Sequence, residues 1–183
     1  MDRPCNRIAA VQGARSAIVQ KIFRDLVIRW RPVIRIAGVI EESHGLEGRA
    51  CSAGVLRSIA DGELYPIFQD LGPGSTACHL EGAGVICAGE AVRRHIAAGC
   101  DLVVLRKFGK LEAAGLGLMA AFSAAFESHV PLLTFVSPYF HDAWAGFVTP
   151  LAVVLPAKPA AADEWLRSVR AGHSITTFRP TEP

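Results

Sequence analysis

The sequence predicts an α/β protein with a three-layer α/β/α sandwich and a mostly parallel sheet. Two observations lead to this class. Short apolar runs typical of buried strands alternate along the chain with amphipathic helical segments, and such alternation implies parallel strands joined by crossover helices. The chain of 183 residues is also 51% hydrophobic and 20% charged, which excludes intrinsic disorder. We expect one domain over residues 1–183.

The first elements follow from the spacing of apolar residues. Residues 7–12 form a short apolar run that ends at Gly13, as a buried strand would. In residues 14–30 apolar side chains recur every three or four positions, with basic residues opposite them, which predicts an amphipathic helix. Pro32 ends this helix. Residues 33–40 are rich in β-branched side chains and predict a second strand.

A β-hairpin is expected to interrupt the alternation at residues 41–74. Residues 50–59 and 63–69 are typical of two strands, and Asp61-Gly62 between them is a strong hairpin signal. The alternation then resumes. We expect helices at 84–98, 114–128 and 160–171, a helix that opens at Ser137-Pro138, and strands at 101–105, 131–136 and 151–155.

The composition also bears on location and partners. No apolar stretch reaches the length of a membrane span or a signal peptide, so we expect a cytoplasmic protein. The five cysteines form no Cys-x-x-Cys pair, and we expect free thiols and no structural metal. Residues 1–35 carry a net charge of +6, but the basic residues alternate with apolar ones. This favours a solvated helix face, and nucleic acid is not an expected partner. The mean hydropathy of +0.31 fits either a homo-oligomer or a rich core.

The loop between the first strand and helix lies where a phosphate-binding loop would. That loop requires Gly-x-x-x-x-Gly-Lys-Ser/Thr, because glycines let backbone N–H groups surround the phosphate and the lysine neutralises it. Here Gly13, Arg15 and Ser16 remain, and the Gly-Lys step is absent. These residues are candidates for binding an anion at a helix N-terminus. A plain connection from strand to helix is an equally good interpretation.

The second candidate loop follows the strand at 101–105. In nucleotide hydrolases the corresponding strand ends in acidic residues that order magnesium and activate water. This strand instead ends in Arg106 and Lys107, which would repel a metal cation and attract an anion. Lys107 and Lys110 on either side of Gly109 are therefore candidate anion ligands. The alternative is a solvated turn in which one lysine pairs with Glu112.

The segment from Lys107 to Glu112 resembles a motif of the thermophilic nucleoside-triphosphatase family, which are P-loop proteins. Gly109, Lys110 and Glu112 match its Gly-Lys-Met-Glu stretch, and Arg106 and Lys107 stand where that family has two acidic residues. The chain is more similar to uncharacterised bacterial nucleoside-triphosphatase-like proteins, often encoded beside molybdate transport genes. The shared motifs are the loop at 69–75, the Lys-Phe-Gly-Lys stretch, residues 131–134 and Ala143-Trp144-x-x-Phe147.

This resemblance implies a P-loop-like fold with an inserted hairpin, and a context of molybdate or nucleotide handling. It also directs attention to the glycine-rich loop, where Gly72, Gly74 and Ser75 could form a backbone nest for an anion. An ordinary Pro-Gly turn is the alternative. Asp70, just before this loop, is the best remaining carboxylate for a catalytic or magnesium role, although a loop-capping aspartate is the more common case. We expect Trp144 and Phe147 in the core.

Three functions compete on these grounds. The chain could bind a small oxyanion or a nucleotide phosphate, with molybdate as one candidate, without efficient hydrolysis. It could be an active nucleoside triphosphatase with an atypical site, or a regulatory or structural partner of a transport system that binds no ligand. We favour the first, because phosphoryl transfer needs a metal and a positioned water. Arg106 and Lys107 have the wrong charge to supply them.

Overall fold

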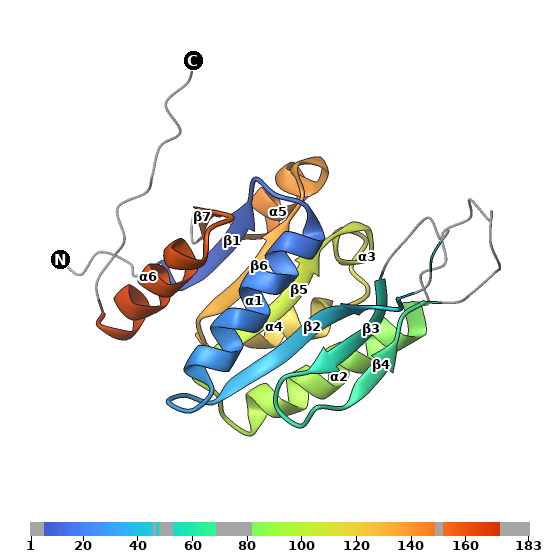
Figure 1. The fold of residues 1–183 in the computed structure, drawn as a ribbon, viewed down its shortest axis with the longest axis horizontal. Helices are drawn as coiled ribbons and strands as arrows, with labels where there is room; N and C mark the ends of the chain where they lie inside the picture. The colour runs from blue at the N-terminus through green and yellow to red at the C-terminus, as the bar shows by residue number, and fades with distance from the viewer. Residues whose placement is uncertain (1–5, 46, 48–52, 69–81, 149–151, 173–183) are drawn as a thin grey trace, which may run out of the picture.

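The computed structural model describes residues 6–45, 47, 53–68, 82–148 and 152–172, and the predicted α/β class is confirmed. Seven strands form one sheet in the order β4-β3-β2-β5-β6-β1-β7 (Figure 1). The strands are β1 (Ile8–Gln12), β2 (Ile36–Ser43), β3 (Ala53–Ser58), β4 (Leu64–Pro66), β5 (Leu102–Phe108), β6 (Leu132–Val136) and β7 (Ala152–Pro156). The helices are α1 (Ser16–Trp30), α2 (Gly82–Ala97), α3 (Lys110–Ala113), α4 (Met119–Glu127), the 3₁₀ turn η1 (Pro138–Phe140), α5 (His141–Val148) and α6 (Pro159–Arg170).

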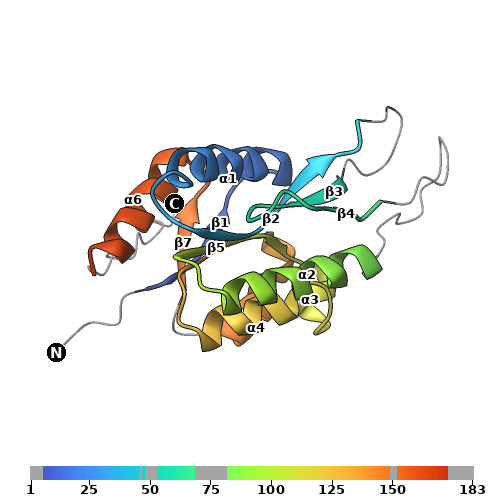
Figure 2. The same cartoon turned by 90° about the horizontal axis from the view of Figure 1, so that it is seen from below.

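Helices cover both faces of the sheet, as a mostly parallel sheet requires. Helices α1 and α6 lie on one face, and α2 and α4 lie on the other (Figure 2). Each face has its own apolar core. One core is built around Phe23 and Trp165, and the other around Phe122 and Trp144. Within the described ranges, none of the helices combines the length and the apolarity that crossing a membrane would need.

The central strands are parallel and buried. Strand β5 lies between β2 and β6, and β1 lies between β6 and β7, all in parallel register. The apolar runs that predict these strands are continuous because both sides of each strand are covered. Consequently, β1, β2, β5, β6 and β7 all end at one side of the sheet. We call this side the carboxyl edge, and the side where these strands begin the amino edge.

The predicted hairpin is present as β3 and β4, joined through Asp61 and Gly62. The Asp61 carboxylate accepts a hydrogen bond from the Glu63 N–H at 3.1 Å, and Gly62 has a φ of +81°, so the turn forms as its sequence indicates. The hairpin extends the main sheet, because β3 pairs antiparallel with β2.

The predicted bounds of the second strand, 33–40, are shifted by three residues from the observed β2. The N–H groups of Val33 and Ile34 both bond to the Trp30 carbonyl, so the turn that ends α1 includes the start of the predicted strand. At its other end, pairing with β3 carries β2 on to Ser43.

The helix predicted at 114–128 is wrong in its first turn. Gly115 and Gly117 have φ values of +77° and +63°, which are left-handed conformations that interrupt a right-handed helix. The chain therefore forms the single turn α3, a loop, and then α4 from Met119. The glycines that interrupt the apolar run in the sequence are the residues that divide it.

The expectation that Trp144 and Phe147 belong to the core is confirmed. Trp144 is buried, and its ring centroid lies 5.2 Å from that of Phe108 and 5.9 Å from that of Phe122. Phe147 is half-buried and packs 4.9 Å from Phe126. These edge-to-face pairs fix α5 against the end of β5 and against α4.

Candidate anion-binding site

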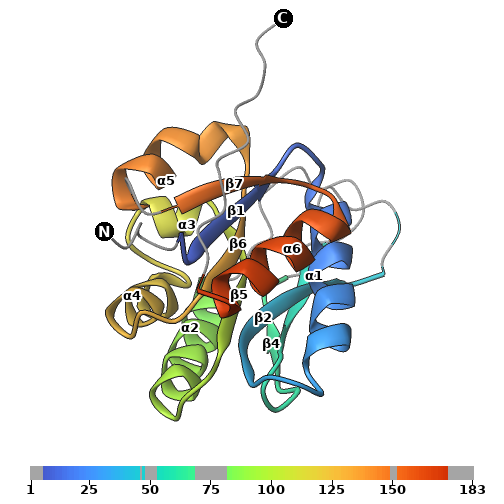
Figure 3. The ribbon, with the colours of Figure 1, turned by 90° about the vertical axis from the view of Figure 1, so that its left-hand side faces the viewer.

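The chain leaves two neighbouring strands in opposite directions at the carboxyl edge. After β1 it turns into α1 on one face, and after β6 it turns into η1 and α5 on the other (Figure 3). Open α/β sheets bind their ligands in the crevice that forms at such a point. The loop at Gly13–Ser16 therefore lies at the position in the fold where a ligand is expected.

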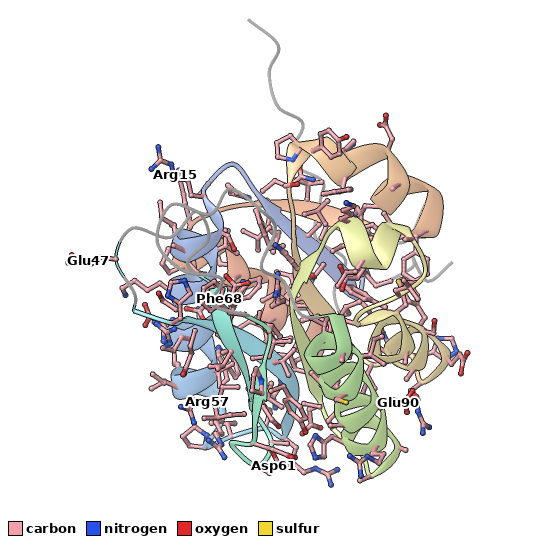
Figure 4. The ribbon with its side chains drawn as sticks, turned by 90° about the vertical axis from the view of Figure 1, so that its right-hand side faces the viewer. Arg15, Glu47, Arg57, Asp61, Phe68 and Glu90 are labelled. Carbon is pink, nitrogen blue, oxygen red and sulfur yellow. The ribbon has the colours of Figure 1, made fainter. Side chains whose placement is uncertain are left out.

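Gly13, Arg15 and Ser16 have distinct roles in this loop. Gly13 has a φ of +91°, which makes the turn from β1 into α1. Arg15 is the extended residue before α1, and its exposed side chain projects from this end of the molecule (Figure 4). Ser16 begins the helix. Its hydroxyl oxygen is buried and has no hydrogen-bond partner among the residues that the structure describes.

A buried arginine lies at the end of β5, and its backbone carbonyl contacts the side chain of Gln20 on α1. The Arg106 side chain at the end of β5 is only 3% exposed, and its Nε lies 3.1 Å from Oε2 of Glu41, whose side chain is 12% exposed. The Glu41 oxygen is close but not aligned with the N–H, so the two form an ion pair without a hydrogen bond. Within the described part of the chain, Arg106 Nη1 is buried without a partner. A buried donor without an acceptor is costly, so this group needs an explanation.

Gln20 joins the two strands that carry this pair. Its amide nitrogen donates to the Arg106 carbonyl at 2.7 Å, and its amide oxygen accepts from the Glu41 N–H at 2.9 Å. The parallel pairing of β2 with β5 reaches Val39 and Leu105 and stops there. Beyond this point the Gln20 side chain supplies the hydrogen bonds that β2 and β5 no longer make with each other. Ser16 lies one helical turn before Gln20 and on the same side of α1.

Lys107, Gly109, Lys110 and Glu112 form the turn after β5. Glu112 is 6% exposed, and its two carboxylate oxygens each accept a backbone hydrogen bond of 3.0 Å, from the N–H groups of Gly109 and Leu118. Lys107 is half-buried, and its side-chain carbons lie against Gly109. Lys110 is exposed at the start of α3. Glu112 therefore acts as the cap that closes this turn.

We expect Glu112→Gln to destabilise the protein by about 1–3 kcal/mol. A glutamine keeps one acceptor oxygen and replaces the other with an NH₂ group, so either Gly109 or Leu118 loses its acceptor. Urea denaturation of the variant and of Glu127→Gln, an exposed control on α4, measures the difference. Equal midpoints for the two variants would contradict the capping role.

The described structure adds neither the other predicted residues nor a metal site to this candidate site. Asp70, Gly72, Gly74 and Ser75 lie outside the described residues. In the part of the chain that the structure describes, no three His, Cys, Asp or Glu side chains come together as a metal site would require.

The sequence analysis did not identify Glu41 or Gln20 as site residues. It noted Arg106 only as a basic residue in the place of an acidic one. A usable signal was present. Glu41 and Arg106 each follow an apolar strand, and charged residues that end neighbouring parallel strands meet at the carboxyl edge. Gln20 was also visible as a polar residue within the apolar stripe of the first helix.

The fold and this edge define an α/β protein whose mostly parallel sheet is consistent with a P-loop NTPase-like sandwich. The chain belongs to the family described as protein of unknown function (DUF2478), whose model matches residues 8–165. This agrees with the predicted kinship to uncharacterised bacterial proteins. The more distant resemblance to thermophilic nucleoside triphosphatases stays a prediction.

A named relative adds one further finding. The chain is 32% identical over 167 residues to the molybdenum import ATP-binding protein ModC 2 of Bradyrhizobium diazoefficiens. The match covers 88% of this chain and 18% of the relative, so this chain spans less than a fifth of that protein's length. No solved structure matches the chain.

Proposed function

We propose that this protein binds a small tetrahedral oxyanion, or the phosphate group of a nucleotide, at the carboxyl edge and does not hydrolyse it efficiently. The observation that carries the proposal is the buried Arg106 guanidinium with an unpartnered Nη1. Guanidinium groups bind phosphate-like oxyanions through charge-assisted hydrogen bonds. An anion at this edge would give the buried donor its missing acceptor.

Other donors at the carboxyl edge support the same ligand class. The first turn of α1 contains no acidic residue, so its free N–H groups and partial positive charge are not already neutralised. The Ser16 hydroxyl is a further group without a partner in the described structure. Arg15 and Lys107 add positive charge to the two loops, and Gly13 lets the backbone approach a ligand closely.

The carboxylates favour binding over hydrolysis. A hydrolase needs acidic side chains that hold magnesium and position water. At this edge Glu41 is paired with Arg106, Glu42 is paired with Arg57, and both oxygens of Glu112 accept backbone hydrogen bonds. Each of these carboxylates already has a structural partner.

A role beside a molybdenum transport system is the second candidate. It rests on the name of the relative, a molybdenum import ATP-binding protein, of which the match covers 18%. Molybdate is itself a tetrahedral oxyanion, so it belongs to the ligand class proposed above. An ATP or GTP phosphate belongs to the same class, and the experiment below separates the two.

Thermal unfolding with molybdate, inorganic phosphate, ATP or GTP tests the proposal. At a concentration of 100 times Kd, a bound anion stabilises the folded state by about 2.7 kcal/mol. For the anion that stabilises the native protein, we expect Ser16→Ala to lower the affinity roughly tenfold or more, because the variant loses one hydrogen bond to a charged group. Without ligand the variant should unfold like the native protein, since the hydroxyl has no partner to lose among the described residues.

The control is Ser128→Ala, which changes an exposed serine at the end of α4 and should leave both stability and binding unchanged. Absence of stabilisation by all four anions would overturn the proposal and leave the ligand-free partner role. Magnesium-dependent phosphate release well above background would instead favour the nucleoside triphosphatase.

A further inference from the structure

A cavity lies at the amino edge, at the opposite end of the sheet from Arg106. It has a volume of about 390 Å³ and lies between the start of β2, the end of α2 and the turn from β3 to β4. Figure 4 shows Asp61, in that turn, at the other end of the molecule from Arg15. The lining residues that matter below are Arg31, Arg35, Ile36, Ile59, His95 and Cys100.

The exposed side chain of Arg35 lies at this cavity, next to Gly99. Its two Nη atoms and Cζ lie 3.4–3.8 Å from the point where a Cβ on Gly99 would stand, so the end of the guanidinium group contacts that glycine. Gly99 has a φ of +97° and ends α2 in a left-handed conformation. The backbone conformation favours glycine there, and a Cβ would meet the arginine only at ordinary van der Waals distance. Among the described residues, the Arg35 guanidinium has no ion-pair partner.

Arg31 approaches from another side. Its Nη2 lies 3.5 Å from the Ala60 carbonyl in the hairpin turn, which is a long contact that leaves most of its donors available. The two arginines thus line one cavity from the end of α1 and the start of β2.

The acidic groups around the cavity already have partners. Asp61 is 3.1 Å from His95 Nε2 and also accepts the Glu63 N–H. Asp101 accepts the backbone N–H of Arg35 at 2.8 Å. The C-terminal end of α2 contributes a negative potential equivalent to only about half an elementary charge. Asp61 and Asp101 keep their negative charges and offset much of the charge of the two arginines, so the cavity offers an anion guanidinium N–H donors and not an excess of positive charge.

We propose that this cavity binds a small organic anion, with its carboxylate or phosphate between Arg31 and Arg35 and its apolar part against Ile36 and Ile59. Both isoleucines are buried parts of the core that reach the cavity wall. The volume lies within the range of small-ligand sites, roughly 300–1,000 Å³. This site shares no residue with the carboxyl edge and does not depend on the function proposed there.

Cys100 offers a local readout, because its half-buried thiol lines the cavity. Burial raises the pKa of this thiol, so the thiol reacts slowly with alkylating agents. A ligand in the cavity would slow the alkylation of Cys100 further. Cys87 on α2 is exposed and does not line the cavity, which makes it an internal control. Alkylation by neutral iodoacetamide, followed at each cysteine by mass spectrometry, reports occupancy of the cavity.

The probes are phenyl phosphate, phenol and inorganic phosphate. At about ten times its Kd, phenyl phosphate should slow alkylation of Cys100 about tenfold and leave Cys87 unchanged. Phenol lacks the charge and inorganic phosphate lacks the apolar part, so each should protect much less. Protection should be lost in Arg35→Gln. It should persist in Ser16→Ala.

Each contrary result overturns the proposal. If phenyl phosphate leaves the Cys100 rate unchanged in the native protein, the cavity does not bind this class of ligand. Equal protection by phenol shows that charge is not recognised, and unchanged protection in Arg35→Gln shows that the arginine is not involved. Loss of protection in Ser16→Ala would mean that the two sites are not separate.

Discussion

Replacing Arg106 with methionine is expected to destabilise the protein by about 3–5 kcal/mol. The single change removes the partner of Glu41 and leaves a carboxylate that is 12% exposed without its counter-charge. The cost of burying an isolated charge is far larger than the net gain from a buried pair. Urea denaturation should therefore show a large fall in the midpoint with little change in slope.

The double variant Glu41→Gln, Arg106→Met should recover most of this loss, because it removes both charges from the interior. It is also the sharpest test of function. A folded protein without the guanidinium should no longer be stabilised by the anion that stabilises the native protein. The double variant thus separates loss of the ligand group from loss of the fold.

The matched control is Arg57→Met. Arg57 and Glu42 form an exposed pair, with Arg57 Nε 2.7 Å from the carboxylate of Glu42. Exposed pairs contribute about 0–1 kcal/mol, so this change should cost far less than the loss of Arg106. If Arg57→Met and Arg106→Met had equal effects, burial of the second pair would have no energetic consequence. The double variant would then have nothing to recover.

Local signals predicted most of the fold. The apolar runs at β1 and β6 and the Asp61-Gly62 turn each report on conformation within a few residues, and the structure follows them. The errors arose where another contact decided the outcome. The helix expected at 114–128 begins later than predicted, because two glycines in its first turn adopt left-handed conformations. Strand β2 is longer than predicted because it pairs with β3, and the residues of β2 do not specify that partner.

The candidate site was less accessible to sequence reasoning. The exposed side of the turn after β5 could be predicted, since Lys110 follows a strand end and is exposed. The meeting of Arg106 with Glu41 had a signal, because both follow apolar strands, but the direction of the Arg106 side chain had none. The pairing of β5 with β6 is irregular between Leu105 and Phe108, and such a bulge changes where the following side chains point. A bulge depends on packing between strands and leaves no local pattern.

Gln20→Leu is the second change with a large expected effect, about 2–6 kcal/mol. Leucine fits the apolar face of α1 and has helix propensity no worse than glutamine, so helix formation itself is not impaired. The loss comes from two backbone groups, the Glu41 N–H and the Arg106 carbonyl, which no longer have the amide as their partner. Each unsatisfied buried group costs about 1–3 kcal/mol.

A graded series identifies the cause. Gln20→Glu places a carboxyl group at a site that is 4% exposed and can donate to the Arg106 carbonyl only when protonated, so its stability should lie below that of the native protein at neutral pH and approach it as the pH is lowered. Gln12→Leu is the control, because Gln12 makes an exposed contact of 3.2 Å with His141 Nδ1 and its loss should be small. If Gln20→Leu costs no more than Gln12→Leu, the amide does not join the two strands.

Hydrogen exchange at the Glu41 amide connects this junction to the proposed ligand. In Gln20→Leu that amide should exchange faster than in the native protein, because its acceptor is gone. An anion bound by Arg106 should slow exchange at the same amide in the native protein, since Gln20 links it to the Arg106 backbone. In Gln20→Leu the anion should still bind but protect this amide less. Equal protection in both proteins would mean that the amide bridge does not couple β2 to the ligand.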